Sequence, residues 1–147
     1  MDPTAPVGTT LIRLAALITD RYEMISGELG MDFRTGRLLV AVTRRPQTVG
    51  ELGRYVRLGK STMTGVLGRL VSGGLVVREP NPDDRRAILI VPTPRGRELA
   101  GALVTRVRAE VLRLLEPMAP DARAELSALL QVILDAADQA DGLLPPE

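Results

Sequence analysis

The sequence predicts a mainly α-helical fold that contains one small β-hairpin. Apolar residues recur at helical spacing through most of the chain. In the centre the pattern changes to two short runs rich in β-branched residues, LVV at 75–77 and AILIV at 87–91. A charged loop with two prolines separates these runs. The 147 residues suffice for one folded unit with its own core, so we expect a single domain over residues 1–147.

Two helices are expected before the central region. The first covers about residues 10–29, where a glycine follows, and Thr9 or Thr10 is its candidate N-cap. The second covers residues 33–44, with Asp32 as the cap that satisfies its first amide groups.

A third and a fourth helix follow in close succession. Thr48 and Glu51 have the spacing of a capping box, which begins a short third helix. A fourth helix over residues 60–72 ends at a Gly-Gly pair. Two helices joined by a tight, glycine-containing turn indicate a helix-turn-helix. The inward residues of the third helix are predicted to be Val49, Leu52 and Val56.

The hairpin comes next and leads into the C-terminal helices. Pro92 cannot donate to a sheet and marks the end of the second strand. Thr93 and Pro94 are an N-cap followed by a proline in the first helical turn, so a long helix is expected from there to about residue 115. After a proline-rich break, a last apolar-periodic helix begins near residue 121. A helix-turn-helix followed directly by a hairpin is a winged helix-turn-helix.

The composition excludes several kinds of chemistry. Because the chain has no cysteine and no histidine, disulfides, thiolate or imidazole metal sites and thiol redox switches cannot form, and no metal or cofactor is expected. The paired acids Asp83 and Asp84 stand beside arginines, where ionised carboxylates do not serve as general acids. An enzyme is therefore disfavoured. With no apolar run near the roughly 18 residues of a membrane span and no signal-peptide pattern, a cytoplasmic protein without membrane contact is expected.

Positive charge is concentrated in the middle of the chain. Residues 34–97 contain thirteen basic and four acidic residues, a balance of +9, whereas the remainder contains six basic and fourteen acidic residues, a balance of −8. A basic centre between acidic flanks is typical of a protein that binds nucleic acid through its middle segment. A winged-helix module that binds another protein and has no DNA target is the alternative, and this charge balance argues against it.

Two motifs in the basic segment resemble the MarR family of bacterial transcription regulators. KSTMTGVLGRLVSGGLVVRE (60–79) is similar to that family's recognition helix and the start of its wing. DRRAILIVPTPRG (84–96) fits its wing signature D-x-R-x-x-x-L-x-L-T-x-x-G, except that Pro92 stands where leucine is usual. The resemblance implies a winged helix-turn-helix over 34–97 and a homodimer formed by helices 9–29 and 98–140. Such a dimer represses transcription from a palindromic operator on double-stranded DNA and responds to a small molecule.

The resemblance also implies a set of DNA-binding residues. Lys60, Ser61, Thr62 and Thr64 lie at or near the start of the recognition helix, where they are expected to meet base edges or phosphates. Capping of the helix by Ser61 and Thr62 is the structural alternative. Gly65 offers no side chain, which favours readout of DNA shape over direct base contacts. Phosphate contacts are expected from Arg54, Arg57 and Arg69.

In the wing, Arg86 occupies the signature position and is expected to enter a minor groove, whose negative potential attracts arginine. Asp84 is expected to orient its guanidinium, and Arg85 to contact a phosphate. A surface salt-bridge cluster, worth at most about 1 kcal/mol, is the alternative.

A small lipophilic or anionic aromatic effector is also expected from the resemblance. Tyr22, Phe33 and Arg37 are the candidate residues of its site. Tyr22 and Phe33 are residue types that more often simply pack in a core, which is the alternative.

Overall fold

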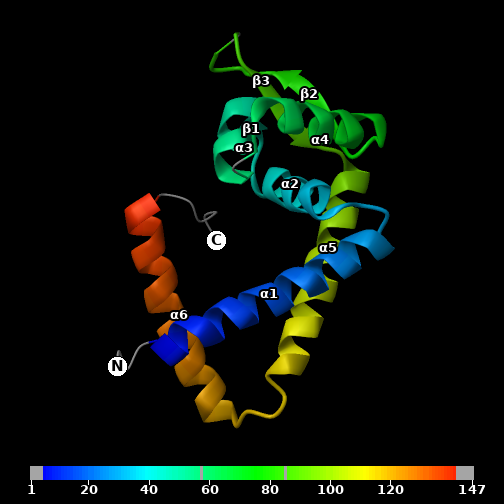
Figure 1. Ribbon diagram of the computed structural model, residues 1–147. Helices are drawn as coiled ribbons and strands as arrows, with labels where there is room; N and C mark the ends of the chain where they lie inside the picture. Colours follow the sequence, from blue (N-terminus) through cyan, green and yellow to red (C-terminus); the bar gives the residue numbers. More distant parts are fainter. Residues whose placement is uncertain (1–4, 57, 85, 142–147) are drawn as a thin grey trace.

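The computed structural model describes residues 5–56, 58–84 and 86–141, with side chains from residue 6 to residue 137 of these ranges. The predicted fold class is confirmed, since helices predominate and the strands form one small sheet (Figure 1). The elements in chain order are α1 (Ala5–Glu28), α2 (Phe33–Arg44), β1 (Gln47–Thr48), α3 (Val49–Val56), α4 (Lys60–Ser72), β2 (Val76–Pro80), β3 (Ile88–Pro92), α5 (Pro94–Leu114) and α6 (Pro120–Asp141).

The hydrophobic core lies within the winged helix and at its junction with α1 and α5. Every described apolar residue that is buried falls between Ile25, near the end of α1, and Leu103, in the first half of α5. The buried residues of α4 recur at helical spacing. These are Met63, Val66, Leu67 and Leu70.

The sheet has one strand more than the predicted hairpin. The short strand β1 pairs antiparallel with β3, with Gln47 opposite Ile90, so the strand order is β1-β3-β2. The buried Gln47 side chain donates to the Ala41 carbonyl of α2 at 2.9 Å. β2 and β3 form the predicted wing, and β3 ends at Pro92 as expected. The third strand fixes the base of the wing to the start of α3.

Three predicted helix caps are confirmed. The Asp32 carboxylate accepts the amide proton of the residue three positions further on, at 2.7 Å. Thr48 and Glu51 form the capping box in both directions, with contacts of 2.8 and 3.3 Å between side chain and backbone. Thr93 accepts an amide of the first turn of α5 at 3.0 Å. Local capping chemistry therefore sets where α2, α3 and α5 begin.

Two local predictions are wrong. The first helix begins at Ala5, so Thr9 and Thr10 lie inside it and do not cap it; the Thr10 hydroxyl donates to the Pro6 carbonyl at 2.8 Å. Val49, predicted to point inward, is 37% exposed. It is the first residue of α3 and lies outside the part of that helix that packs on the core.

The base of the wing is held tightly against the start of α5. Gly74 has a φ of 66°, a conformation that favours glycine, and its carbonyl accepts the Thr93 hydroxyl proton at 2.7 Å. A Cβ added to Gly96 would lie 2.0 Å from the carbonyl oxygen of Leu75. Thr93 and Gly96 of the wing signature therefore both contribute to the close approach between the start of α5 and the backbone at Gly74 and Leu75.

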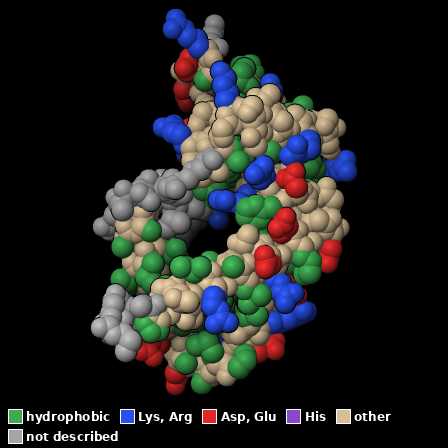
Figure 2. Space-filling model, viewed as in Figure 1, with side chains coloured by type: hydrophobic (Ala, Val, Ile, Leu, Met, Phe, Trp, Pro, Cys, Tyr) green, Lys and Arg blue, Asp and Glu red, His purple; other side chains and the backbone are tan. Residues whose placement is uncertain are grey.

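The flanking helices are much less buried than the winged helix. In Figure 1 α1 crosses α5, and α6 turns back from the far end of α5 and lies apart from the winged helix. No side chain described for α6 is buried. Figure 2 shows hydrophobic side chains on the visible surface of these helices. Exposed large apolar residues on α1, α5 and α6 include Val7, Ile12, Leu112, Leu129, Val132 and Ile133. None of the described helices is long and apolar enough to cross a membrane.

Candidate DNA-binding interface

The start of α4 is open to solvent. Its N-cap is Gly59, which makes no side-chain hydrogen bond to the helix. Ser61 and Thr62 lie inside the first turn, so the alternative that they cap the helix is wrong. Lys60, Ser61 and Thr64 are exposed, and Thr62 is half-buried. The helix therefore presents one cation, short hydroxyl side chains and its own backbone N–H groups at this end.

The outer face of α4 is almost free of long side chains. Ser61, Gly65, Gly68 and Ser72 are all exposed and lie opposite the buried face of the helix. A Cβ added to Gly65 or to Gly68 would meet no other atom within 4 Å. Because the side chains on this face are short or absent, another molecule can approach the helix backbone closely.

The wing tip is organised by aspartate and asparagine side chains. The Asp84 carboxylate accepts the backbone N–H of Arg86 at 3.0 Å, and the Asn81 side chain accepts that of Asp83 at 3.0 Å. Among the residues that the structure describes, no carboxylate forms an ion pair with Arg86. The expectation that Asp84 orients the guanidinium is therefore corrected: it fixes the backbone at Arg86, and the exposed side chain is left available.

Arg54 is exposed on α3 and lies near the capping box. The Glu51 carboxylate accepts the backbone and hydroxyl protons of Thr48, and these bonds, with smaller contributions from Arg45 and Arg54, hold its pKa below the ordinary value of 4.5. Arg45 approaches Glu51 at 3.6 Å. One ionised carboxylate thus sits between two arginines on this surface. The predicted phosphate contacts Arg57 and Arg85 lie outside the described residues.

Arg69 lies near the other end of α4 and is engaged with α2. Its guanidinium pairs with the Asp32 carboxylate at 2.8 Å and approaches the Thr35 hydroxyl at 3.4 Å. Burial raises the pKa of Asp32, but the hydrogen bonds from Thr35 and the charge of Arg69 outweigh it and lower the pKa. A DNA phosphate would have to compete with this ion pair for Arg69.

The predicted effector residues lie together where α1 meets α2. The rings of Tyr22 and Phe33 meet edge to face with centroids 5.2 Å apart. The Arg37 guanidinium lies 5.7 Å from the centre of the Phe33 ring. Burial raises the pKa of Tyr22 to about 12, although Arg37 opposes the shift. The three side chains therefore form one partly buried cluster that combines aromatic surface with a cation.

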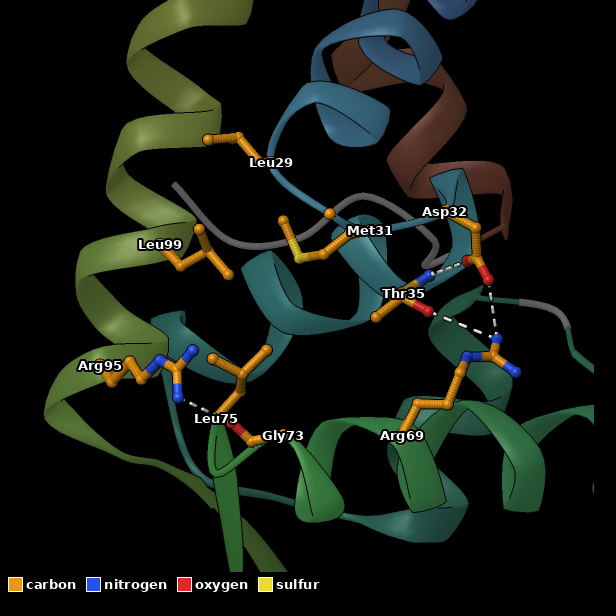
Figure 3. A pocket seen from close by; sticks show the side chains of 10 residues that line it. Leu29, Met31, Asp32, Thr35, Arg69, Gly73, Leu75, Arg95 and Leu99 are labelled. Carbon is orange, nitrogen blue, oxygen red and sulfur yellow. Dashed lines mark hydrogen bonds and ion pairs between the residues drawn. The ribbon is translucent and has the colours of Figure 1, made fainter.

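A cavity of about 470 Å³ is a feature that the sequence did not indicate (Figure 3). It lies between the turn that follows α1, the start of α2, the end of α4 and the start of α5. Its apolar lining residues are Leu29, Met31, Leu75 and Leu99, and its polar ones are Asp32, Thr35, Arg69 and Arg95. The residues of the Tyr22 cluster do not line it. Within the described ranges, no group of three or more acidic side chains could hold a metal ion.

The order α2-α3-α4 followed by the β2–β3 wing, with a core of its own, defines a winged helix-turn-helix protein. Residues 29–87 match the family model described as "MarR family". The winged helix of this chain is therefore of the MarR type, as the two motifs indicated.

Individual relatives agree with this assignment. The HTH-type transcriptional regulator YcgE of Bacillus subtilis is 45% identical over 47 residues, which are 32% of this chain and 30% of that protein. The MarR family protein Rv2887 of Mycobacterium tuberculosis, solved with p-aminosalicylic acid, is 25% identical over 88% of this chain and 98% of that chain, with a TM-score of 0.71. Rv1404 of the same species has a TM-score of 0.77 at 24% identity, covering 92% of this chain and 95% of that chain, and shares the fold.

The first three curated relatives are matched over only part of their length. The aligned segments cover 30%, 58% and 47% of these proteins. The match to the family model covers residues 29–87, whereas the similarity in structure extends over nearly the whole chain.

Proposed function

We propose that this protein is a DNA-binding transcriptional regulator that binds a palindromic operator as a homodimer. The observation that carries the proposal is the open start of α4, where Lys60, Ser61 and Thr64 are exposed and no side chain caps the helix. This end lies in the segment 34–97, whose charge balance is +9. Figure 2 shows Lys and Arg side chains around the wing and the winged helix. A basic, open helix end suits a phosphate-lined groove.

Within this function α4 enters the major groove and the wing reaches a minor groove. Lys60, Ser61, Thr62 and Thr64 contact base edges or nearby phosphates. Arg86 enters the minor groove from a loop that Asp84 holds in shape. Contacts to the phosphate backbone come from Arg54, Arg57 and Arg85, and from Arg69 if it leaves Asp32.

The homodimer is formed by the flanking helices in residues 9–29 and 98–140. Large apolar side chains on α1, α5 and α6 are exposed in the single chain. A two-fold dimer, the commonest oligomer, buries such faces by pairing the same surface of both protomers. A dimer also places two recognition helices about 34 Å apart, one turn of B-DNA.

The regulator responds to a small lipophilic or anionic aromatic effector. The cluster of Tyr22, Phe33 and Arg37 offers aromatic surface beside a cation, which suits an aromatic acid. Rv2887 was solved with p-aminosalicylic acid, a ligand of that class. Repression is the proposed direction of control, and it is exerted in the cytoplasm.

Fluorescence anisotropy with duplexes from around the protein's own gene tests the central proposal. We expect one duplex to bind at least a hundredfold more tightly than random DNA, with a logarithm of affinity that falls steeply with the logarithm of salt concentration. Arg86→Ala is expected to weaken binding about tenfold while leaving the thermal midpoint unchanged. An affinity that is no higher for any of these duplexes than for random DNA, together with no salt dependence, would contradict the proposed operator binding.

The alternative function is a winged-helix module that binds a protein and has no DNA target. It predicts no preference among duplexes and no loss of affinity when Arg86 is replaced. The basic balance of the winged helix supports DNA as the partner. The same composition, without cysteine or histidine, supports the absence of enzymatic activity.

A further inference from the structure

Lys60, the first residue of α4, is the only lysine in the chain. The other eighteen of the nineteen basic residues are arginines, and the chain has no cysteine and no histidine. A lysine amine can lose its proton and be acylated, whereas the guanidinium of arginine stays charged. Because no side-chain thiol or imidazole competes for an acyl group, Lys60 carries the one side-chain amine that an acylating reagent can convert to an amide.

The Lys60 side chain is accessible and has no partner in the described part of the chain. It is exposed, and no carboxylate among the described residues forms an ion pair with it. Only its backbone is engaged, since the Lys60 carbonyl accepts the Thr64 hydroxyl proton at 2.9 Å. Its neighbours Gly59 and Ser61 are exposed and have no side chain or a short one. A reagent can therefore reach the amine without breaking an ion pair or displacing a side chain.

The surroundings of Lys60 attract anions. Lys60 belongs to the segment 34–97, whose charge balance is +9, and Arg54 is exposed on the neighbouring helix α3. Acyl phosphates are small anions that carry an activated carbonyl group. The positive potential that suits DNA phosphates therefore also raises the concentration of an acyl phosphate near the amine. This favours an acyl phosphate over a neutral acyl donor.

We propose that Lys60 is an acylation site through which small acyl phosphates regulate the DNA-binding surface. The neutral amine of Lys60 attacks the carbonyl carbon of the acyl phosphate, a C–N bond forms, and the C–O bond to the phosphate breaks. Inorganic phosphate leaves with the electron pair of that bond, and the amine proton goes to solvent. The product is an amide, which has lost the positive charge of the ammonium group.

The regulatory consequence of this site rests on the proposed function. Lys60 lies at the end of α4 that is proposed to meet DNA, and a homodimer has two such lysines. Each lost cation lowers the slope of log affinity against log salt by about 0.9, so two acylated sites lower it by about two. The amide also loses the charge-assisted bonds of the ammonium group. Acylation is therefore expected to weaken DNA binding, and bound DNA is expected to cover the amine.

Acetyl phosphate is the probe, and the full-length protein is treated with it. Peptide mass spectrometry measures acetylation at Lys60 and at the N-terminal amine of the chain, which serves as the internal reference. We expect acetylation at Lys60. A bound duplex from around the protein's own gene should slow it about fivefold or more, but not that of the N-terminal amine. In anisotropy with this duplex, the acetylated protein should bind about tenfold or more weakly, with a salt slope lower by about two.

Two variants separate acylation of Lys60 from other effects of the reagent. Lys60→Arg has no side-chain amine, so its DNA affinity should be the same before and after treatment with acetyl phosphate. Combining Lys60→Arg with Arg108→Lys moves the single lysine to an exposed position of α5, outside the basic segment. This protein should be acetylated at position 108, again with the same DNA affinity before and after treatment.

Several results would overturn the proposal. These are a Lys60 that stays unmodified while the N-terminal amine is acetylated, equal protection of both amines by DNA, and unchanged DNA affinity after acetylation of Lys60. Equal losses of affinity in wild type and in either variant would also overturn it. The mass measurement does not depend on DNA binding. An acetylated Lys60 in a protein that prefers no duplex therefore retains the modification site, whereas the regulatory role is lost with the proposed function.

Discussion

The winged helix and the flanking helices differ in how far their apolar side chains are buried. In the winged helix, Leu38, Leu52 and Ile90 are completely buried against neighbouring elements. In α6, Leu129 and Val132 are 59% and 67% exposed. Both regions have apolar residues at helical spacing, so periodicity alone does not distinguish a face that is covered within the chain from one that needs a partner. The buried core lies in the winged helix and at its junction with α1 and α5, whereas α6 has no buried side chain among those described.

Charge differs between the same two regions. The winged-helix segment has an excess of basic residues, and the rest of the chain has an excess of acidic ones. Acidic flanks are repelled by a phosphate backbone, which in the proposed dimer would keep the apolar faces of α1 and α6 away from DNA. The division of charge thus agrees with the separate DNA and dimer contacts that the proposed function requires.

The largest effect is expected from substitutions on the exposed apolar face of α6. Leu129→Asp combined with Val132→Asp places two charges per protomer on the exposed face of α6, and four per dimer. We expect the dimer dissociation constant to rise about a thousandfold, which corresponds to about 4 kcal/mol. Sedimentation equilibrium measures this change.

The matched control for α6 is an equally accessible apolar residue in the wing. Val77 of β2 is 41% exposed, and Val77→Asp is expected to leave the dimer mass unchanged. If both variants remain dimeric at low concentration, the exposed face of α6 is not the interface. Dimer formation would then not explain why the apolar residues of α6 are exposed.

The next effect concerns the junction of the two regions, at the start of α5. Gly96→Ala would place a methyl group against the Leu75 carbonyl, where no flexible side chain can yield, so we expect a loss of about 3 kcal/mol. Gly101→Ala on the same helix has free space around it and should gain up to about 1 kcal/mol. Urea unfolding at one protein concentration measures both. Similar values for the two variants would show that the close approach has no energetic importance.

Features set by neighbouring residues could be predicted from the sequence, and features set by distant ones could not. The caps at Asp32, Thr48 and Thr93 were predicted, because a cap depends on residues within one turn. The strand β1 was missed, since its two residues form a strand only by pairing with β3, some forty positions away. The cavity was missed for the same reason, because three separate segments of the chain line it.

Roles of single side chains within a correctly predicted element were harder to predict. The wing was found from its signature, but Asp84 binds the backbone of Arg86 and not its guanidinium. Arg69 was expected to face DNA, and its pairing with Asp32 depends on how α4 packs on α2. Side-chain direction follows from tertiary packing, about which the sequence pattern carries little information.

A moderate effect is expected from the capping box of α3. Glu51→Gln removes the carboxylate that accepts the Thr48 protons and should cost about 1 kcal/mol at pH 7. Because these bonds lower the pKa of Glu51, its contribution is fully present above pH 4.5 and is lost as the pH falls through the lowered pKa. The stability difference between wild type and variant should therefore shrink from pH 6 to pH 3 in urea titrations.

An exposed glutamate of α6 serves as the control for this pH dependence. Glu125 forms no ion pair within the described ranges. Glu125→Gln should therefore leave the stability nearly unchanged at every pH. A constant difference between wild type and Glu51→Gln across the titration would contradict the ionised capping box.

The smallest effect is expected from two substitutions on the outer face of α4, which distinguish a change in stability from a change in DNA affinity. Gly65 and Gly68 are both exposed on α4 with open space around them, so replacing either by Gln should stabilise the helix by roughly 0.5–1 kcal/mol. Their positions differ by nearly one turn along the helix. Gly65 lies nearer the open end with Lys60 and Ser61, so a longer side chain there meets the groove first. Gly65→Gln is therefore expected to change DNA affinity severalfold in the anisotropy assay, and Gly68→Gln to change it less. Equal gains in stability with equal DNA affinities would place the DNA contact away from this face of α4.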